Sequence, residues 1–158
     1  DRCDTQKDVR AVASLMAQYV YNQKREYFEE NKIEKINILI NGNQGGYLTK
    51  DLGLVEKKKK IADELVYLFV NRKFKAIYEQ GSDEFKSIVD EQEFVSGVNG
   101  TVSVKSLKAE LYGFSLYTSP ADHEYYCNLI YSFKDKHLLS FNMNMDPDKE
   151  GIFDIEFR

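Results

Sequence analysis

The fold is decided by the stretch Tyr125-Tyr126-Cys127-Asn128-Leu129-Ile130-Tyr131-Ser132-Phe133, in which every second residue is apolar. The same period of two returns downstream, in Leu139, Phe141, Met143, Met145, Phe153, Ile155 and Phe157. A period of two buries one face of a β-strand. Turn residues at 134–136 and 146–151 separate these runs. The sequence therefore predicts an antiparallel meander at this end of the chain.

Before Asn99 the apolar spacing changes to three and four residues, which is the period of a helix. The first helix is expected to begin at a cap on Asp4 or Thr5 and to reach about Phe28. Its buried stripe is expected to contain Val9, Val12, Met16, Tyr19, Gln23 and Tyr27. Its solvent face is expected to contain Lys7, Arg10, Ser14, Gln18 and Arg25.

Further helices are expected before the strands. One runs from about 54 to 71 and opens at Thr49 or Asp51, and another covers 74–80 and stops at Gly81. Ser82 then caps a short helical turn, and Asp90 with Glu93 resembles a capping box for the next one.

Two segments are harder to assign. Residues 36–40 alternate and predict a short strand, followed by a turn cluster at 41–46, although this region also suits the irregular end of the first helix. From Thr101 a long bent strand is expected, with bulges near Lys105-Ser106 and Tyr112-Gly113. The bulges bring three apolar groups into phase: Val102 and Val104; Leu107, Ala109 and Leu111; Phe114 and Leu116.

These elements predict an α+β fold, with N-terminal helices packed on a curved four- to five-stranded antiparallel meander sheet. At 158 residues the chain is expected to form a single domain, 1–158. Within it, 1–54 supplies a helix with a short strand and loop, and 55–158 supplies helices followed by the sheet.

The run Ala62-Asp63-Glu64-Leu65-Val66-Tyr67-Leu68-Phe69-Val70-Asn71-Arg72-Lys73-Phe74 has a helix, a short polar elbow and an aromatic that opens the next helix. With the strands that follow, it resembles the opening of the nuclear transport factor 2-like (cystatin-like) cone fold, in its small bacterial extracytoplasmic type. The resemblance covers about 55–158 and is one of layout. It implies a cone-like sheet under helices, and no catalytic residue is carried over.

Charge is divided unevenly along the chain. Residues 1–80 carry 15 Lys and Arg against 12 Asp and Glu, a net +3, and residues 81–158 carry 7 against 14, a net −7. The acidic half argues against nucleic acid as a partner. The basic run 57–60 is expected to be a solvated helix face, with phosphate or anionic lipid contact as the alternative. Because the chain starts at Asp1 without Met, we expect an extracytoplasmic protein, either secreted, periplasmic or membrane-anchored.

Catalytic and metal signals are few. Asp122 and His123 offer an Asp–His pair, and His137 is the other histidine. The alternation Asp146, Asp148, Glu150 superficially suggests Ca²⁺ but lacks an EF-hand glutamate and predicts an acidic turn. Gly42, Gly45 and Gly46 lack a phosphate-loop spacing. The sequon Asn99-Gly100-Thr101 also suits a turn, and Cys127 is expected to be either a buried hydrophobe or a disulfide partner of Cys3. No cofactor or metal is expected.

Aromatic residues of the sheet are the best ligand-binding candidates: Tyr112, Phe114, Tyr125 and Tyr131. They suit an apolar ligand or peptide, and the alternative is that they pack under the helices. We expect a non-enzymatic extracytoplasmic binding or assembly module. The alternatives are a small-ligand enzyme that uses the Asp–His pair and a secretion or conjugation subunit that acts by self-association.

The terminal strand is expected to lie at the sheet edge, where unpaired backbone groups can recruit a strand of a partner or of a second copy. Beside it, Ser140, Asn142 and Asn144 share a polar outer face with Asp154 and Glu156. We expect a protein, peptide or homodimer contact at this edge or on the aromatic face, and none at the lysines of 57–60.

Overall fold

The computed structural model describes residues 6–101, 108–134, 136–149 and 151–158. Its helices are α1 (Gln6–Glu30), α2 (Thr49–Val70), α3 (Phe74–Glu79), α4 (Asp83–Ile88) and α5 (Glu91–Thr101). Its strands are β1 (Lys35–Ile40), β2 (Asn43–Leu48), β3 (Ala109–Thr118), β4 (Tyr125–Phe133), β5 (Leu138–Asn144) and β6 (Asp154–Phe157). The predicted α+β class is confirmed, with all five described helices ahead of the main sheet.

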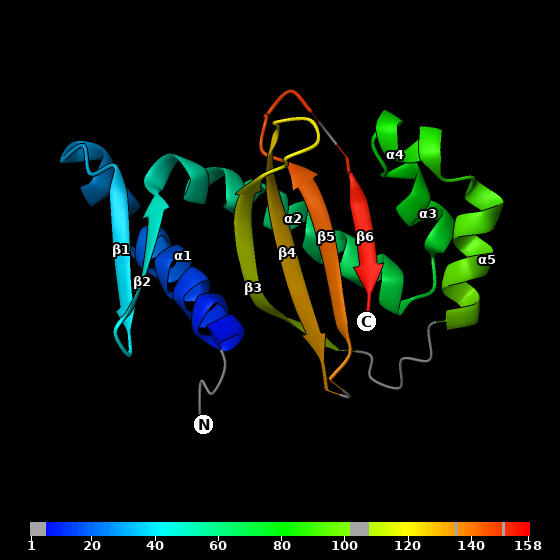
Figure 1. Ribbon diagram of the computed structural model, residues 1–158, viewed down its shortest axis with the longest axis horizontal. Helices are drawn as coiled ribbons and strands as arrows, with labels where there is room; N and C mark the ends of the chain where they lie inside the picture. Colours follow the sequence, from blue (N-terminus) through cyan, green and yellow to red (C-terminus); the bar gives the residue numbers. More distant parts are fainter. Residues whose placement is uncertain (1–5, 102–107, 135, 150) are drawn as a thin grey trace.

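The main sheet is an antiparallel meander in the order β3-β4-β5-β6, so the terminal strand lies at an edge as predicted. Figure 1 shows α2 running behind this sheet, with α1 and the β1–β2 hairpin on the side of β3 and α3, α4 and α5 on the side of β6. The face toward α2 is the core, and its residues in β4 and β5 are buried: Cys127, Leu129, Tyr131, Phe133, Leu139, Phe141 and Met143. The alternation of period two therefore marks the core face.

Helix α1 closes the outer edge of β3. The Oγ atom of Ser14 accepts a hydrogen bond from the backbone N–H of Phe114, at 3.0 Å. The register of β3 against β4 shifts between Leu111 and Gly113, which confirms the second predicted bulge. The first predicted bulge, at Lys105 and Ser106, and the expected strand residues on either side of it lie outside the described residues: Val102, Val104 and Leu107.

The start of the long strand is wrong in the prediction, because α5 continues through Thr101 and β3 begins only at Ala109. The turn expected at Asn99-Gly100-Thr101 is likewise helical. Phe94 and Val98 lie one turn apart in α5 and pack against the core. This packing stabilises the helical conformation through the Asn-Gly pair that follows.

The turn cluster expected at 41–46 is only partly right. Asn41 and Gly42 form a turn with left-handed φ of 49° and 80°, and the predicted strand at 36–40 pairs through it with β2. Asn-Gly is the preferred pair for a tight hairpin turn, so the chain reverses at once. Gly46, expected in the turn, lies instead in β2, where it pairs with Asn37 of β1.

The buried face of α1 differs from the predicted one at most positions, although Val9 is buried and Arg10 is exposed as predicted. Val12, Met16, Tyr19 and Tyr27 are exposed, whereas Ala13, Ser14, Ala17, Gln18 and Tyr21 are buried. The reason is close approach: a Cβ on Gly113 of β3 would lie 2.8 Å from the Cα of Ala11. Small residues let the helix backbone reach the strand, and large apolar ones would hold it away.

The solvated face expected for 57–60 is wrong at one position. Lys58 is only 6% exposed, and its Nζ donates to the backbone carbonyl of Lys149 at 3.2 Å. Lys57 and Lys60 are exposed, and Lys59 pairs with Asp63 one turn on. The four-residue run turns through more than one face of α2, so one lysine must point at the sheet.

Candidate functional site

The four predicted ligand-binding residues lie along the contact between the sheet and the helices. Phe114 is buried and packs edge-to-face on Tyr47 of the hairpin, with ring centroids 6.0 Å apart. The three tyrosines donate their hydroxyls to helix aspartates: Tyr112 to Asp8, Tyr125 to Asp51 at 3.0 Å, and Tyr131 to Asp63 at 2.7 Å. These side chains thus join the layers of the fold, and Tyr125 also borders an open cavity of about 390 Å³.

Burial and these aspartates change the acidity of the tyrosines. Burial above all, followed by the hydrogen bond to Asp51, raises the pKa of Tyr125 to about 12. The same two causes raise the pKa of Tyr131, whose partner is Asp63.

Alkaline pH should therefore destabilise the fold. Above about pH 10 the tyrosines of the unfolded chain ionise first, while the folded chain keeps Tyr125 protonated up to about pH 12. The stabilisation is complete below pH 10, and we expect the urea midpoint to fall steadily from there to pH 12. Tyr131→Phe should make this fall shallower. A midpoint that is constant over the interval in the unmodified protein would contradict the expectation.

Asp122 directs its carboxylate to partners other than His123. It accepts hydrogen bonds from the backbone N–H of Glu124 at 3.0 Å and from the hydroxyl of Tyr126 at 2.8 Å. The N–H of Glu124 above all holds the pKa of Asp122 below its usual value. His123 is exposed, and the ring of His137 lies 5.2 Å from that of Phe157, at the start of β5.

Metal and thiol chemistry receive little support from the described part of the chain. No group of three His, Cys, Asp or Glu side chains there is arranged to hold a metal ion. Asp146 forms the predicted acidic turn, since its Oδ1 accepts from the backbone N–H of Asp148 at 2.9 Å. Glu150 and Cys3 lie outside the described residues, and Cys127 is a buried free thiol whose pKa burial raises to about 12.

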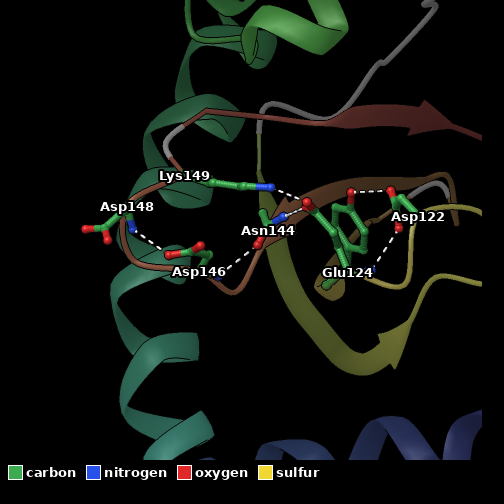
Figure 2. Close-up of polar contacts among 7 residues, drawn as sticks. Asp122, Glu124, Asn144, Asp146, Asp148 and Lys149 are labelled. Atoms are coloured by element: carbon green, nitrogen blue, oxygen red, sulfur yellow. Dashed lines mark hydrogen bonds and ion pairs between the residues drawn. The ribbon is translucent and has the colours of Figure 1, made fainter.

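A polar cluster fixes the loop that leads into β6. Figure 2 shows Glu124 accepting hydrogen bonds from Asn144 at the end of β5 and from Lys149 in the following loop. The carboxylate of Glu124 raises the pKa of Lys149. Because Lys58 binds the carbonyl of Lys149 from α2, the loop is held from two directions.

The chain after this loop is then joined to the corner between α3 and α4. Ile152 pairs in parallel with Gly81: its N–H donates to Gln80 at 3.0 Å, and its carbonyl accepts from Ser82 at 2.9 Å. Gly81 follows the C-cap of α3 as predicted, but the structural demand is space, since a Cβ would lie 2.3 Å from the ring of Phe85. The predicted cap is confirmed, with Ser82 Oγ accepting from Phe85 N–H at 3.1 Å. This junction holds the helices beside the edge of β6.

Beyond the junction, strand and helices separate and leave a cavity of about 480 Å³, which we call the β6 groove. Phe69 of α2 borders it next to Phe157, with ring centroids 5.4 Å apart. Its other apolar side chains come from α4 and the residue after it, from α5 and from β6: Phe85, Val89, Phe94, Val98 and Ile155. Ile155 and Phe157 belong to the core face of the sheet, yet they are only half-buried. The core-face side chains of β4 and β5 are covered by packed side chains, whereas these two border the open groove.

The backbone of β6 faces the groove at alternate residues. Leu138 and Arg158 exchange two backbone hydrogen bonds, each of 2.9 Å. Such bonded pairs alternate along an antiparallel ladder, so Glu156 also faces β5. The N–H and C=O groups of Ile155 and Phe157 therefore point away from β5, and within the described residues they have no backbone partner on that side.

The sequence predicted the open edge but not the groove. Its helical wall depends on the pairing of Gly81 with Ile152, two residues far apart in the chain. The helical spacing of Phe94 and Val98 was the available signal, and it indicates a buried face without indicating what that face meets.

None of the helices in the described part of the chain has the length and apolar character needed to cross a bilayer. The order of helices followed by a meander is compatible with a cone-like fold. Comparison with protein families, characterised proteins and solved structures finds no match to this chain.

Proposed function

We propose that this protein is a non-enzymatic binding module that captures an extended polypeptide segment in the β6 groove. The observation that carries the proposal is the coincidence of an apolar cavity with an unpaired strand edge, at Ile155 and Phe157. An extended segment satisfies both features, because its backbone pairs with β6 and its alternate side chains enter the cavity. An apolar small molecule would fill the cavity and leave the backbone groups unpaired.

A single segment fits better than the sheet of a second copy. The far wall of the groove is α5, with Phe94 and Val98 facing β6 across the cavity. The sheet of a second copy would bring its own helices toward the place that α5 occupies, whereas a single extended segment brings none.

The layout suggests the wider class. Helices ahead of a meander occur in nuclear transport factor 2-like proteins, and we extend the proposal to an extracytoplasmic member of that class. The support is the element order and the resemblance of the segment around Phe74, which opens α3.

Gly97 of α5 allows a direct test, because it borders the groove and a Cβ there meets nothing within 4 Å. We expect Gly97→Leu to weaken binding of the labelled peptide acetyl-GVTVTVTG-amide about tenfold or more, by occupying the groove. Gly97→Ala is the matched control and should bind within about twofold of the unmodified protein, since it adds one methyl group. Fluorescence anisotropy measures both affinities.

Hydrogen exchange adds a second measurement. The amide hydrogens of Ile155 and Phe157 should exchange more slowly when the peptide is bound, because they become part of a new ladder. Equal affinity of the Gly97→Leu variant, together with unchanged exchange at these two amides, would show that the groove is not the binding site.

A further inference from the structure

We propose that the segment captured in the β6 groove alternates apolar and basic residues, with the basic side chains recognised by Asp154. This inference rests on the proposed function and specifies the ligand of the same site. Side chains of an added strand alternate between the two faces of the sheet, whichever way the strand runs.

The inner positions must be apolar. Residues opposite Ile155 and Phe157 would point to the core side of the sheet, where Phe69, Phe85 and Phe94 border the groove. A charged side chain there would lose its hydration without gaining a partner of opposite charge.

The outer positions face carboxylates. Residues opposite Asp154 and Glu156 would share the polar outer face with them. Glu156 is already paired, since Arg158 donates to it through Nε at 2.6 Å and Nη2 at 2.7 Å. Asp154 is exposed, and its described contact is a neutral one, with Asn142 Nδ2 at 3.3 Å.

Within the described ranges, no lysine or arginine forms an ion pair with Asp154 or with Glu93 on the helical wall. Both carboxylates border the groove, and the half of the chain that contains them has a net charge of −7. A basic residue opposite Asp154 gains a cross-strand ion pair, while an acidic one is repelled. The charge of Asp154 and Glu93 at the border of the groove therefore selects basic ligands, and the apolar lining of the groove buries the apolar side chains of the ligand.

The test compares four labelled peptides at low salt: acetyl-GVKVKVKG-amide, acetyl-GVEVEVEG-amide, acetyl-GVTVTVTG-amide and acetyl-GVVVKKKG-amide. We expect the alternating lysine peptide to bind about tenfold more tightly than the alternating glutamate peptide, with a difference that shrinks at high salt. It should also bind more tightly than the lysine peptide of the same composition without alternation. Equal binding of those two would mean general attraction to an acidic protein and would overturn the inference.

Asp154→Asn should remove most of the preference for lysine over threonine and leave the threonine peptide unchanged. Glu26→Gln is the matched control, because Glu26 is an exposed carboxylate of α1, outside the groove. If Asp154→Asn has no more effect than Glu26→Gln, the charge selection is wrong. If threonine and lysine peptides bind equally well and Gly97→Leu still blocks both, the inference fails while the proposed function stands. If none of the peptides binds in the groove, the proposed function fails.

Discussion

We expect Lys58→Glu to lower the free energy of unfolding by about 3–5 kcal/mol, the usual cost of leaving a charge buried without its partner. Lys58 is 6% exposed, and the substitution would put a carboxylate against the carbonyl oxygen of Lys149, which its ammonium now binds. The same reversal at exposed Lys57 or Lys60 should change stability by no more than about 0.5 kcal/mol.

Urea unfolding of the three variants measures this contrast. Lys58→Met separates the two parts of the effect, because it keeps the apolar stem and removes the charge. Its loss should be about 1–3 kcal/mol, from the carbonyl left without a donor. Equal stability of Lys58→Glu and Lys57→Glu would mean that Lys58 reaches solvent.

Phe141→Ala should be comparably damaging, with a loss of about 3–5 kcal/mol. Phe141 is fully buried at the centre of the inner face, opposite Leu129 on β4 and Ile155 on β6. Its ring lies 6.1 Å from that of Tyr131 in an edge-to-face contact. Removing it opens a cavity that strands fixed on both sides cannot close.

Leu39→Ala is the control for this substitution, because Leu39 is a large apolar residue of β1 that is 71% exposed. It should change the free energy of unfolding by about 0.5 kcal/mol or less. A similar loss for both variants, measured by the same urea titration, would contradict the assignment of the core to the inner face of the main sheet.

The parts of the fold that follow from local chemistry could be predicted. Alternation in β4 and β5 identifies their core faces, and the phase change between Leu111 and Phe114 indicates the bulge. The capping oxygens of Ser82 and Asp90 locate the starts of α4 and α5. Each of these signals acts over a few residues, and a sequence records such effects directly.

The parts of the fold that depend on partners far apart in the chain could not be predicted from the sequence. Ser14 and Gln18 are buried although the predicted stripe places them on the solvent face, because α1 packs closely against β3. Gly46 belongs to a sequence cluster that is typical of a turn, yet it pairs with Asn37 in the hairpin. The same limit applies to the site: the chain order places β6 last, but the contact between Gly81 and Ile152, which joins the helical wall of the groove to the chain before β6, is between residues far apart in the sequence.

The two edge strands of the main sheet, β3 and β6, have different surroundings, and this limits how the protein can assemble. Helix α1 packs against β3, and Ser14 accepts a hydrogen bond from the backbone of Phe114 at that edge, so strand addition there is blocked, while β6 opens toward a space that α5 bounds. A strand added to β6 would itself be covered by α5 and could not template another. The proposed capture is therefore expected to stop at one strand for each copy of the chain, without seeding a fibre.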